Sequence, residues 1–217
     1  MSHHHHRARF REDRLAVLDI ETISGEEMPD GAFPPWCTHT PVIASLLTAD
    51  RNSDGLWSFS LTSVDFSIDD QPLTRIEELV AGRSIATFGG RHFDLPVLML
   101  TAQKMRSFAL PALGRAAREP RFHSAFHYDL ADRYSAYGSA RGASLERLCG
   151  ALGIAAKLDV HGSEVGQLYD QGRVDEIARY CEGDVASTLL LLANQRAIET
   201  GDSVYHASLT YQFVRWL

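Results

Sequence analysis

Short apolar runs in the first third of the chain predict the strands of a β-sheet. Hydrophobic residues dominate positions 15–20, 42–49 and 56–61, and runs of this length are typical of buried strands. The segment Asn52-Ser-Asp-Gly55 separates the last two runs and predicts a hairpin turn. Together the three runs predict neighbouring strands that are largely antiparallel.

Helical spacing begins after the third run. Apolar residues recur three or four positions apart and predict a helix that ends before Gly82: Leu73, Ile76, Leu79 and Val80. Residues 84–88 then predict a buried strand, so a strand, helix, strand crossover is expected. Residues 95–104 predict a second helix, because Pro96 is tolerated in a first helical turn.

The second half of the chain is predicted to be mostly helical. Ser144 is typical of an N-cap before a short helix that ends at Gly150 or Gly153. The longest helical pattern covers residues 174–198, and one side of that helix carries Ile177, Tyr180, Asp184, Thr188 and Leu191. Residues 25–41 and 134–143 are rich in Gly, Pro, Ser and aromatic residues and predict loops.

Composition bounds the domain organisation and the compartment. The chain has 217 residues, of which 45% are hydrophobic and 23% charged, which predicts one α/β domain over residues 10–217. The run His3–His6 resembles a purification tag, so residues 1–9 are excluded from the functional argument. No apolar run is long enough to span a bilayer and no secretory pattern is present, which predicts a cytoplasmic protein. The three cysteines are expected to be reduced, buried thiols.

Charge is distributed unevenly along the chain. The net charge is −7, but residues 103–147 carry eight Lys or Arg against four acids, which leaves a net +4 in that stretch. Six aromatic residues are interleaved with this positive charge: Phe108, Phe122, Phe126, Tyr128, Tyr134 and Tyr137. Such a mixture suits a surface that holds phosphates and stacks bases. Composition leaves open the alternative that the rings belong to the core and the arginines to a solvated face.

Candidate chemistry begins with pairs of acidic residues. Asp19 and Glu21 flank Ile20, and the alternation of a strand places both carboxylates on one face. Asp94 follows the strand predicted at 84–88, and Tyr180 and Asp184 lie one helical turn apart. Each feature alone has a structural explanation: a polar strand end, a helix cap or a tyrosine–aspartate hydrogen bond.

Four acids in apolar surroundings require compensation if they converge. Two unit charges about 5 Å apart repel by roughly 3 kcal/mol at an effective dielectric constant of about 20. Cations would remove this repulsion, and ligand sets made only of oxygen select Mg²⁺ or Mn²⁺ rather than zinc. A cluster of these acids therefore predicts a site for hard divalent metals.

The three motifs, in this order, resemble those of the DEDD superfamily of 3′-5′ exonucleases. The residues are Asp19-Ile-Glu-Thr, then Phe88-Gly-Gly-Arg-His-Phe-Asp94-Leu-Pro, then Tyr180-Cys-Glu-Gly-Asp184, which is the pattern of the tyrosine-bearing (DEDDy) branch. The chain is most similar to stand-alone relatives of the proofreading exonuclease domain of family B DNA polymerases, over about residues 15–198. The resemblance implies a ribonuclease H-like fold, with a mixed five-stranded sheet flanked by helices.

The same resemblance implies roles for single residues. Asp19 would bridge two metal ions, with Glu21 and Asp184 completing the first site. Asp94 would serve the second site, and Tyr180 would orient the attacking water, since a phenol with a pKa of about 10 is a poor base at neutral pH. Contacts with the substrate are expected from five further residues: Thr22, Ile23, Gly90, Arg91 and Phe93.

One position departs from the pattern of the relatives. They usually carry Asn after the Phe of the second motif, where it helps to hold the terminal nucleotide, and this chain has Gly89 there. Metal binding should survive this change, while the grip on the substrate is expected to weaken. Arg91 or His92 is a candidate for a replacement contact, and an exposed loop is the alternative interpretation.

Two pairs of residues outside these motifs carry weaker signals. His123 and His127 are spaced as zinc ligands can be, but no third soft ligand lies near them in the sequence. Lys157 and His161 lie in a loop that contains glycine, where either a phosphate contact or plain solvation is possible.

The resulting hypothesis is an enzyme that cuts single-stranded DNA from its 3′ end. It would hydrolyse terminal phosphodiester bonds with two Mg²⁺ or Mn²⁺ ions and release nucleoside 5′-monophosphates. DNA repair or proofreading is the expected context, with a polymerase or repair protein as a candidate partner and no membrane contact. The alternatives are an exoribonuclease that trims RNA ends and a non-catalytic nucleic-acid-binding module of the same fold. The sequence leaves the oligomeric state open.

Overall fold

The computed structural model of the chain describes residues 10–26, 28, 32–154 and 162–217. The tag-like segment, with His3–His6, lies outside these residues. So do Lys157 and His161, the two candidate phosphate contacts of the loop before the last helices.

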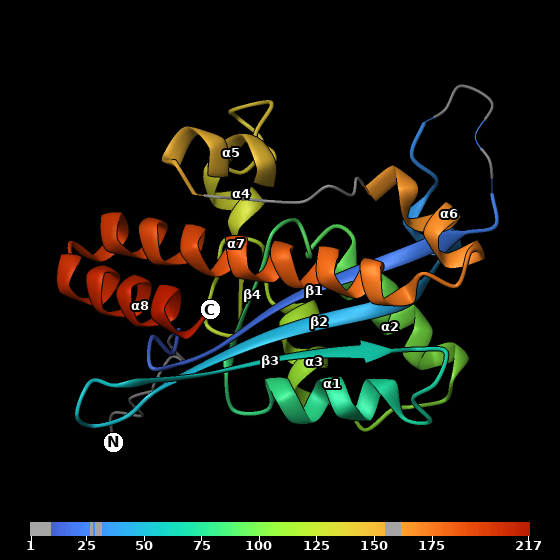
Figure 1. The fold of residues 1–217 in the computed structure, drawn as a ribbon, viewed down its shortest axis with the longest axis horizontal. Coiled ribbons are helices and arrows are strands. Elements are labelled where there is room, and N and C mark those ends of the chain that lie inside the picture. The colour runs from blue at the N-terminus through green and yellow to red at the C-terminus, as the bar shows by residue number, and fades with distance from the viewer. Residues whose placement is uncertain (1–9, 27, 29–31, 155–161) are drawn as a thin grey trace, which may run out of the picture.

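A mixed five-stranded sheet organises the molecule (Figure 1). Its strands are β1 (Arg14–Ser24), β2 (His39–Arg51), β3 (Trp57–Asp65), β4 (Ser84–Thr87) and β5 (His127–Asp129). They lie in the order β3-β2-β1-β4-β5, with β1, β2 and β3 antiparallel and with β4 parallel to both β1 and β5. The three predicted antiparallel neighbours and the five-stranded mixed sheet are confirmed.

Strands β1, β2 and β3 are longer than the apolar runs that predicted them, whereas β4 ends at Thr87, one residue before the predicted end. β1 continues to Ser24, so Asp19 and Glu21 lie in the middle of a paired strand and not at its end. β2 begins at His39 and follows a short 3-10 helix, Trp36–Thr38, so the predicted loop at 25–41 was drawn too long. The reason is that backbone pairing continues through polar positions, which a search for hydrophobic runs does not detect.

The hairpin turn between β2 and β3 forms as predicted. The side-chain oxygen of Asn52 accepts hydrogen bonds from the amides of Asp54 (3.0 Å) and Leu56 (2.9 Å). Gly55 has a φ of 82°, a conformation that residues with a side chain rarely adopt. The turn therefore fixes the register between the two strands.

Helices complete the fold after β3. They are α1 (Pro72–Val80), α2 (Asp94–Lys104), α3 (Pro111–Arg118), α4 (Leu130–Tyr134), α5 (Leu145–Leu152), α6 (Val165–Asp170), α7 (Val174–Thr200) and α8 (Ser203–Trp216), with a 3-10 turn at Gly162–Glu164. The predicted N-cap of α5 is present, since the Ser144 hydroxyl accepts from the Arg147 amide, and the helix ends at Gly153 with a φ of 67°. Among the described helices, none has the length and apolar character needed to cross a membrane.

The two faces of the sheet are covered by different helices (Figure 1). Ala16, Leu18 and Ile20 of β1 pack into one core with α1, α2 and α3. Leu15 and Val17 point the other way, into a second core with α7 and α8. Since side chains alternate along a strand, Asp19 and Glu21 continue the second series and face α7.

The basic and aromatic stretch at 103–147 divides between surface and core. Tyr128 is fully buried, and Tyr134 packs at the edge of the same core as α7. Phe108, Phe122 and Phe126 are exposed, together with several of the arginines. Tyr128 and Tyr134 therefore fit the interpretation that the rings belong to the core, whereas the exposed rings remain available for a binding surface.

Candidate active site

Two carboxylates and a thiol meet between β1 and α7. The possible ligand atoms of Asp19, Glu21 and Cys181 all lie within 4.8 Å of one another. The Cys181 thiol donates to Asp19 Oδ2 at 3.4 Å, and burial raises the pKa of this thiol well above its usual range. Cys181 is therefore a protonated neighbour that orients Asp19.

The surroundings of Asp19 and Glu21 destabilise the ionised form of both carboxyl groups. Burial, followed by the charge of Asp184, raises the pKa of Asp19 to about 8. Burial and the charges of Asp19, Asp184 and Asp94 raise the pKa of Glu21 to about 10. Both groups therefore hold their protons more tightly at neutral pH than ordinary carboxyls do.

Asp94 and Asp184 lie near Asp19 and Glu21 but do not belong to the group of ligand atoms within 4.8 Å of one another. Asp94 is the first residue of α2 and is buried, and burial together with the charges of Asp19 and Asp129 raises its pKa well above the ordinary value. Burial raises the pKa of Asp184 to about 6, although its interaction with the Tyr180 hydroxyl opposes the shift. All four acids thus influence one another electrostatically.

Tyr180 lies one turn before Asp184 on α7. Burial, followed by the charges of Asp184, Glu21 and Asp19, raises the pKa of its phenol above the ordinary value. Tyr180 therefore remains protonated at neutral pH and offers a hydroxyl to the acidic cluster. It cannot act as a base there, because its conjugate anion would add to the same repulsion.

The donor set of this cluster fits a hard divalent cation. Asp19 and Glu21 offer close carboxylate oxygens, and the neighbouring Asp94 and Asp184 add further negative charge. Carboxylate oxygens are the ligands that Mg²⁺ and Mn²⁺ prefer, and a bound cation would offset the repulsion that raises the pKa values. The four predicted metal ligands are thus brought into one neighbourhood, while their role as ligands stays a prediction.

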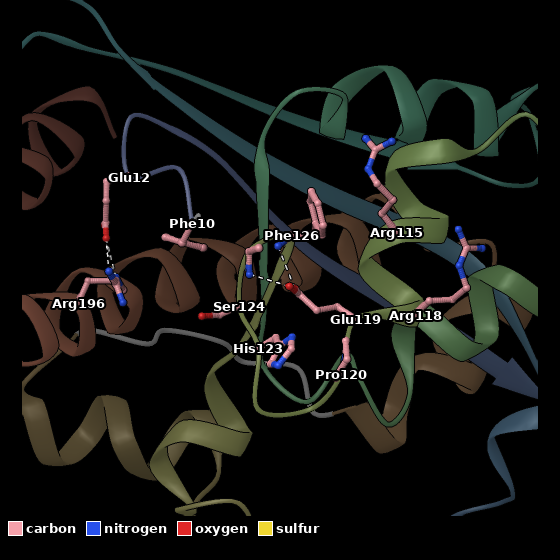
Figure 2. A pocket seen from close by; sticks show the side chains of 11 residues that line it. Phe10, Glu12, Arg115, Arg118, Glu119, Pro120, His123, Ser124, Phe126 and Arg196 are labelled. Carbon is pink, nitrogen blue, oxygen red and sulfur yellow. Dashed lines mark hydrogen bonds and ion pairs between the residues drawn. The ribbon is translucent and has the colours of Figure 1, made fainter. Parts of the chain in front are cut away.

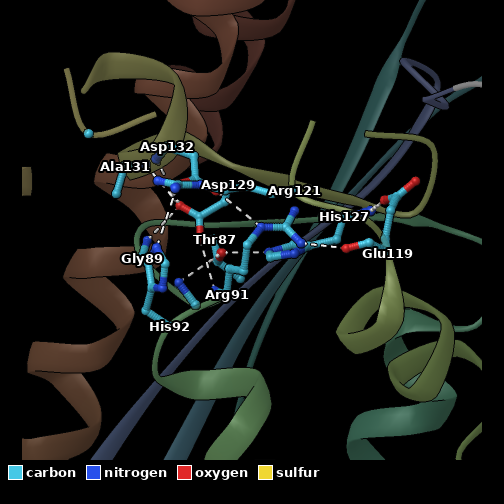
Figure 3. A network of polar contacts seen from close by, with 12 residues as sticks. Thr87, Gly89, Arg91, His92, Glu119, Arg121, His127, Asp129, Ala131 and Asp132 are labelled. Atoms are coloured by element: carbon cyan, nitrogen blue, oxygen red, sulfur yellow. Dashed lines mark hydrogen bonds and ion pairs between the residues drawn. The ribbon is translucent and has the colours of Figure 1, made fainter. Parts of the chain in front are cut away.

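The loop before Asp94 is held by one buried aspartate (Figure 3). Asp129, the last residue of β5, accepts hydrogen bonds from the amides of Gly89 (3.0 Å) and Arg91 (2.8 Å). The same carboxylate accepts from the amides of Ala131 and Asp132 at the start of α4. One side chain therefore fixes the loop of the second motif against the next strand of the sheet.

A second aspartate braces the same loop through arginines (Figure 3). Asp132 accepts from Arg91 Nε at 3.1 Å and from Arg121 at 2.6–2.8 Å, and Arg91 also donates to the Glu119 carbonyl at 2.6 Å. The Arg91 guanidinium is thus held by partners within the protein. Its predicted contact with the substrate stays a prediction, and these bonds favour a structural role.

Two glycines shape this loop. Gly89 has a φ of 86°, and a Cβ atom there would meet only the Ala131 Cβ, at 4.0 Å. At Gly90 a Cβ atom would lie 2.6 Å from Thr87 Oγ1 and 2.7 Å from Asp94 Oδ2. Gly90 is therefore required by close packing, whereas Gly89 has open space beside it.

The remaining predicted substrate contacts lie beside the acids. A register shift in β1 falls between Glu21 and Thr22, and the Thr22 hydroxyl bonds to His39 Nδ1 at 2.7 Å. The His39 ring in turn contacts Phe93 edge-on, with ring centroids 4.9 Å apart. Ile23 packs at the edge of a third cluster formed with α6 and α7. Thr22, Ile23, Gly90 and Phe93 stay predictions as substrate contacts.

The two histidines with zinc-like spacing lie in different environments. His127 is fully buried in β5, shares a hydrogen bond of 2.8 Å with Thr87 Oγ1, and burial lowers its pKa to about 3. His123 is exposed and lines a groove at the sheet edge. Within the described residues, the only group of side chains close enough to share a metal is the one with Asp19, Glu21 and Cys181.

Three residues of this site were missed by the sequence argument. Cys181 and Cys149 are buried as expected, but Cys37 is exposed, and nothing in the sequence pointed to a contact of Cys181 with Asp19. Asp129 and Asp132 were counted only as charges of the basic stretch. The position of Asp129 directly before α4 was the one available signal, since aspartate is favoured at a helix N-cap, and Asp132 lies in the first turn of that helix.

Comparisons with known proteins agree with this geometry at the level of the fold. The structure is similar to the family B DNA polymerase from the hyperthermophilic archaeon Pyrobaculum calidifontis, with a TM-score of 0.58 and 18% sequence identity. The match covers 90% of this chain and 27% of the polymerase, so the chain corresponds to about a quarter of that protein. The mixed sheet with helices on both faces is thereby a ribonuclease H-like fold of the polymerase exonuclease type.

A family model assigns the chain more narrowly. Residues 32–203 match the family of predicted 3′-5′ exonucleases related to the exonuclease domain of PolB, and the chain belongs to this family. The matched range contains Asp94, Tyr180 and Asp184, while Asp19 and Glu21 precede it. No curated protein matches the chain. The expected relationship to the polymerase exonuclease domain is confirmed.

Replacing Gly90 by Ala should displace Asp94. The added Cβ would overlap Thr87 and the Asp94 carboxylate, so we expect a loss of about 1–3 kcal/mol of stability. A displaced carboxylate should also weaken binding of Mn²⁺ by about 10- to 100-fold. Thermal unfolding and titration calorimetry with Mn²⁺ measure the two effects.

Gly150→Ala in α5 is the matched control. A Cβ atom there meets nothing within 4 Å, and alanine favours a helix, so stability should stay equal or rise by up to about 1 kcal/mol. If Gly90→Ala has the same melting temperature and the same affinity for Mn²⁺ as the unchanged protein, Gly90 does not pack closely against Asp94.

Asp132→Asn should destabilise the protein in a pH-dependent way. Burial alone would raise the pKa of Asp132, but hydrogen bonds and charges from Arg121, with further charge from His92 and Arg91, lower it below the ordinary value. The ionised form therefore stabilises the fold above the unfolded pKa of about 4, and this contribution is lost as the pH falls through the folded pKa. We expect a loss of about 2 kcal/mol at neutral pH that shrinks below about pH 4.

Urea unfolding of both proteins across the acid range measures this difference. Asp170→Asn removes an exposed carboxylate and should change stability little at any pH. A constant difference between Asp132→Asn and the unchanged protein at all pH values would contradict the role of the ion pairs.

Proposed function

We propose that the chain is a 3′-5′ exonuclease that hydrolyses the terminal phosphodiester bond of single-stranded DNA and releases nucleoside 5′-monophosphates. The observation that supports it best is the mutual electrostatic influence of four buried or half-buried acids that come from β1, α2 and α7. Membership of a family of predicted 3′-5′ exonucleases supplies the direction of cleavage. A cytoplasmic role in DNA repair or proofreading, with a polymerase or repair protein as partner, is the setting proposed for it.

Asp19, Glu21, Asp94 and Asp184 are the residues proposed to hold two Mg²⁺ or Mn²⁺ ions. Such ions, when bound, supply Lewis acidity that activates water and neutralises charge on the phosphate. Asp19 lies within 4.8 Å of a Glu21 carboxylate oxygen on β1 and interacts with the charge of Asp184 on α7, so it is the candidate for the shared ligand. Cys181 would keep one Asp19 oxygen oriented, since its thiol donates to Oδ2.

Tyr180 is proposed to orient the attacking water. Its pKa is raised by burial and by the surrounding acids, so the phenol keeps its proton at the pH of the reaction. A protonated hydroxyl can donate to one oxygen and accept from a water molecule at the same time. Thr22, Ile23, Gly90 and Phe93 lie around the acids, where the terminal nucleotide would bind.

A metal-dependent ladder of products tests this function. We expect a single-stranded DNA labelled at its 5′ end to shorten stepwise in Mg²⁺ or Mn²⁺, with mononucleotides as the other product. EDTA should abolish the reaction, and Asp19→Asn should lower the rate by about 10²- to 10³-fold. A parallel RNA substrate determines the sugar preference, because only contacts with the 2′-hydroxyl distinguish the two.

Two measurements keep a negative result interpretable. Mn²⁺ should raise the melting temperature of the unchanged protein and not that of Asp19→Asn, whereas Asp54→Asn, in the exposed hairpin turn, should behave as unchanged. Activity that persists in EDTA or in Asp19→Asn contradicts the assignment. Binding of oligonucleotides without any metal-dependent shortening would support the non-catalytic module instead.

Gly89→Asn should strengthen the grip on the terminal nucleotide. Asparagine tolerates a positive φ better than most residues, and the space beside Gly89 accommodates a side chain. We expect KM for the oligonucleotide to fall several-fold while the affinity for Mn²⁺ is retained. Gly89→Ala adds at least as much backbone strain and no amide, so it should not lower KM. Equal effects of the two substitutions would contradict a specific contact.

A further inference from the structure

A groove lies at the edge of the sheet, away from the acidic cluster. Its volume is about 870 Å³, and Figure 2 shows Arg115 and Arg118 of α3 on one side and Phe10 and Arg196 on the other. Phe126, just before β5, lies between the two sides. The groove is therefore framed by helices from both layers of the fold.

The groove and the acids mark opposite ends of the same elements. Asp184 and Arg196 both belong to α7 and are 12 residues apart, which corresponds to about 18 Å along the helix. Phe126 precedes β5, whereas Asp129, which holds the loop of Asp94, ends that strand. The groove is thus separate from the acidic cluster.

Positive charge in the groove is not neutralised within the protein. Over the described ranges of the chain, neither Arg115 nor Arg118 forms an ion pair. The nearby Glu119 carboxylate is turned inward, where it accepts from the amides of Ala125, Phe126 and His127 at 2.6–2.9 Å. Arg196, by contrast, is paired with Glu12 and Glu199. Two guanidinium groups without an ion pair therefore remain on the α3 side.

Aromatic rings accompany these charges. Phe126 is 36% exposed, and the Arg115 guanidinium lies over its ring at 5.6 Å from the centroid. The half-buried ring of Phe10 lines the groove from the opposite side. Arg115 and Arg118 lie in the last turn of α3, where the negative end of the helix dipole favours cations. The dipole does not account for a hollow lined by the rings of Phe126 and Phe10, an arrangement that can stack bases while cations hold phosphates.

We propose that this groove is a second binding site for single-stranded nucleic acid, which holds the part of the substrate strand upstream of its 3′ end. Arg115 and Arg118 bind backbone phosphates, with His123 at the rim, and a base stacks on Phe126. The net charge of −7 repels nucleic acid from the molecule as a whole, so a local cationic groove gives the strand a defined path. The proposal rests on the proposed function, because it presumes a strand whose end reaches the acids.

Binding measured without cleavage tests the groove. The full chain is titrated in EDTA against a fluorescent oligothymidylate, with anisotropy as the readout. Arg115→Gln with Arg118→Gln should raise Kd by about 10-fold or more. The slope of log Kd against the logarithm of salt concentration should fall by the equivalent of about two phosphate contacts. Phe126→Leu should raise Kd about 5-fold or more, since a base loses its ring partner.

A matched pair of exposed arginines is the control. Arg75→Gln with Arg215→Gln makes the same change in charge on α1 and α8 and should leave Kd and the salt dependence almost unchanged. Equal weakening by the two double variants overturns the groove, because it would show only an effect of net charge. Melting temperatures near that of the unchanged protein exclude unfolding as the cause.

Substrate length separates this proposal from the proposed function. In Mg²⁺ the groove variants should raise KM for a long oligonucleotide and not for a dinucleotide, with kcat retained for both. If the unchanged protein cleaves neither substrate, the proposed function fails while the anisotropy result still decides the groove. If poly-glutamate competes as well as the oligonucleotide at equal charge, the groove is an acidic-peptide site and the proposal is overturned.

Discussion

The proximity of like-charged carboxyl groups is the constraint on which the site depends. Asp19 and Glu21 share a face of β1 beneath α7, and Asp94 and Asp184 act on them from two helices. Burial removes the water that would screen these charges, so the folded chain holds protons or cations there more strongly than separate acids would. The sheet and its two cores must supply the stability that this face lacks. They do so through continuous apolar packing on both sides of β1.

A second constraint is the placement of Asp94. The residue starts α2, but its position is set by the preceding loop, which Asp129 and Asp132 hold through backbone amides and arginines. Charge compensation in this network is nearly complete, in contrast to the acidic cluster beside it. The molecule therefore contains two kinds of carboxylate. Those of Asp129 and Asp132 are paired with donors within the protein and fix the loop, whereas those of the acidic cluster lack such partners for their charge among the described residues.

The same contrast extends across the molecule. The acids gather where β1, α2 and α7 meet, while Arg115, Arg118 and the ring of Phe126 gather at the groove before β5. In the proposed function, metal ions at the acids would bind the phosphate to be cut, and the groove would bind the phosphates behind it. Such a groove would give an acidic chain a local affinity for a polyanion without a positive net charge.

The sequence by itself determined the features that depend on local periodicity. Alternation placed Asp19 and Glu21 on one face, helical spacing placed Tyr180 over Asp184, and Asn52 with Gly55 made the hairpin. Resemblance in three ordered motifs predicted the fold, whose fifth strand has only three residues and leaves no periodic signal of its own.

Only the tertiary structure decided which distant groups meet. Cys181 lies beside Asp19 across 162 residues, and Asp129 holds Gly89 across 40. Packing also decided that Tyr128 enters the core while Phe126, two residues earlier, lines a groove. The physical reason is that the burial and partners of a polar or aromatic side chain depend on the elements packed against it, and neighbours in sequence do not specify these.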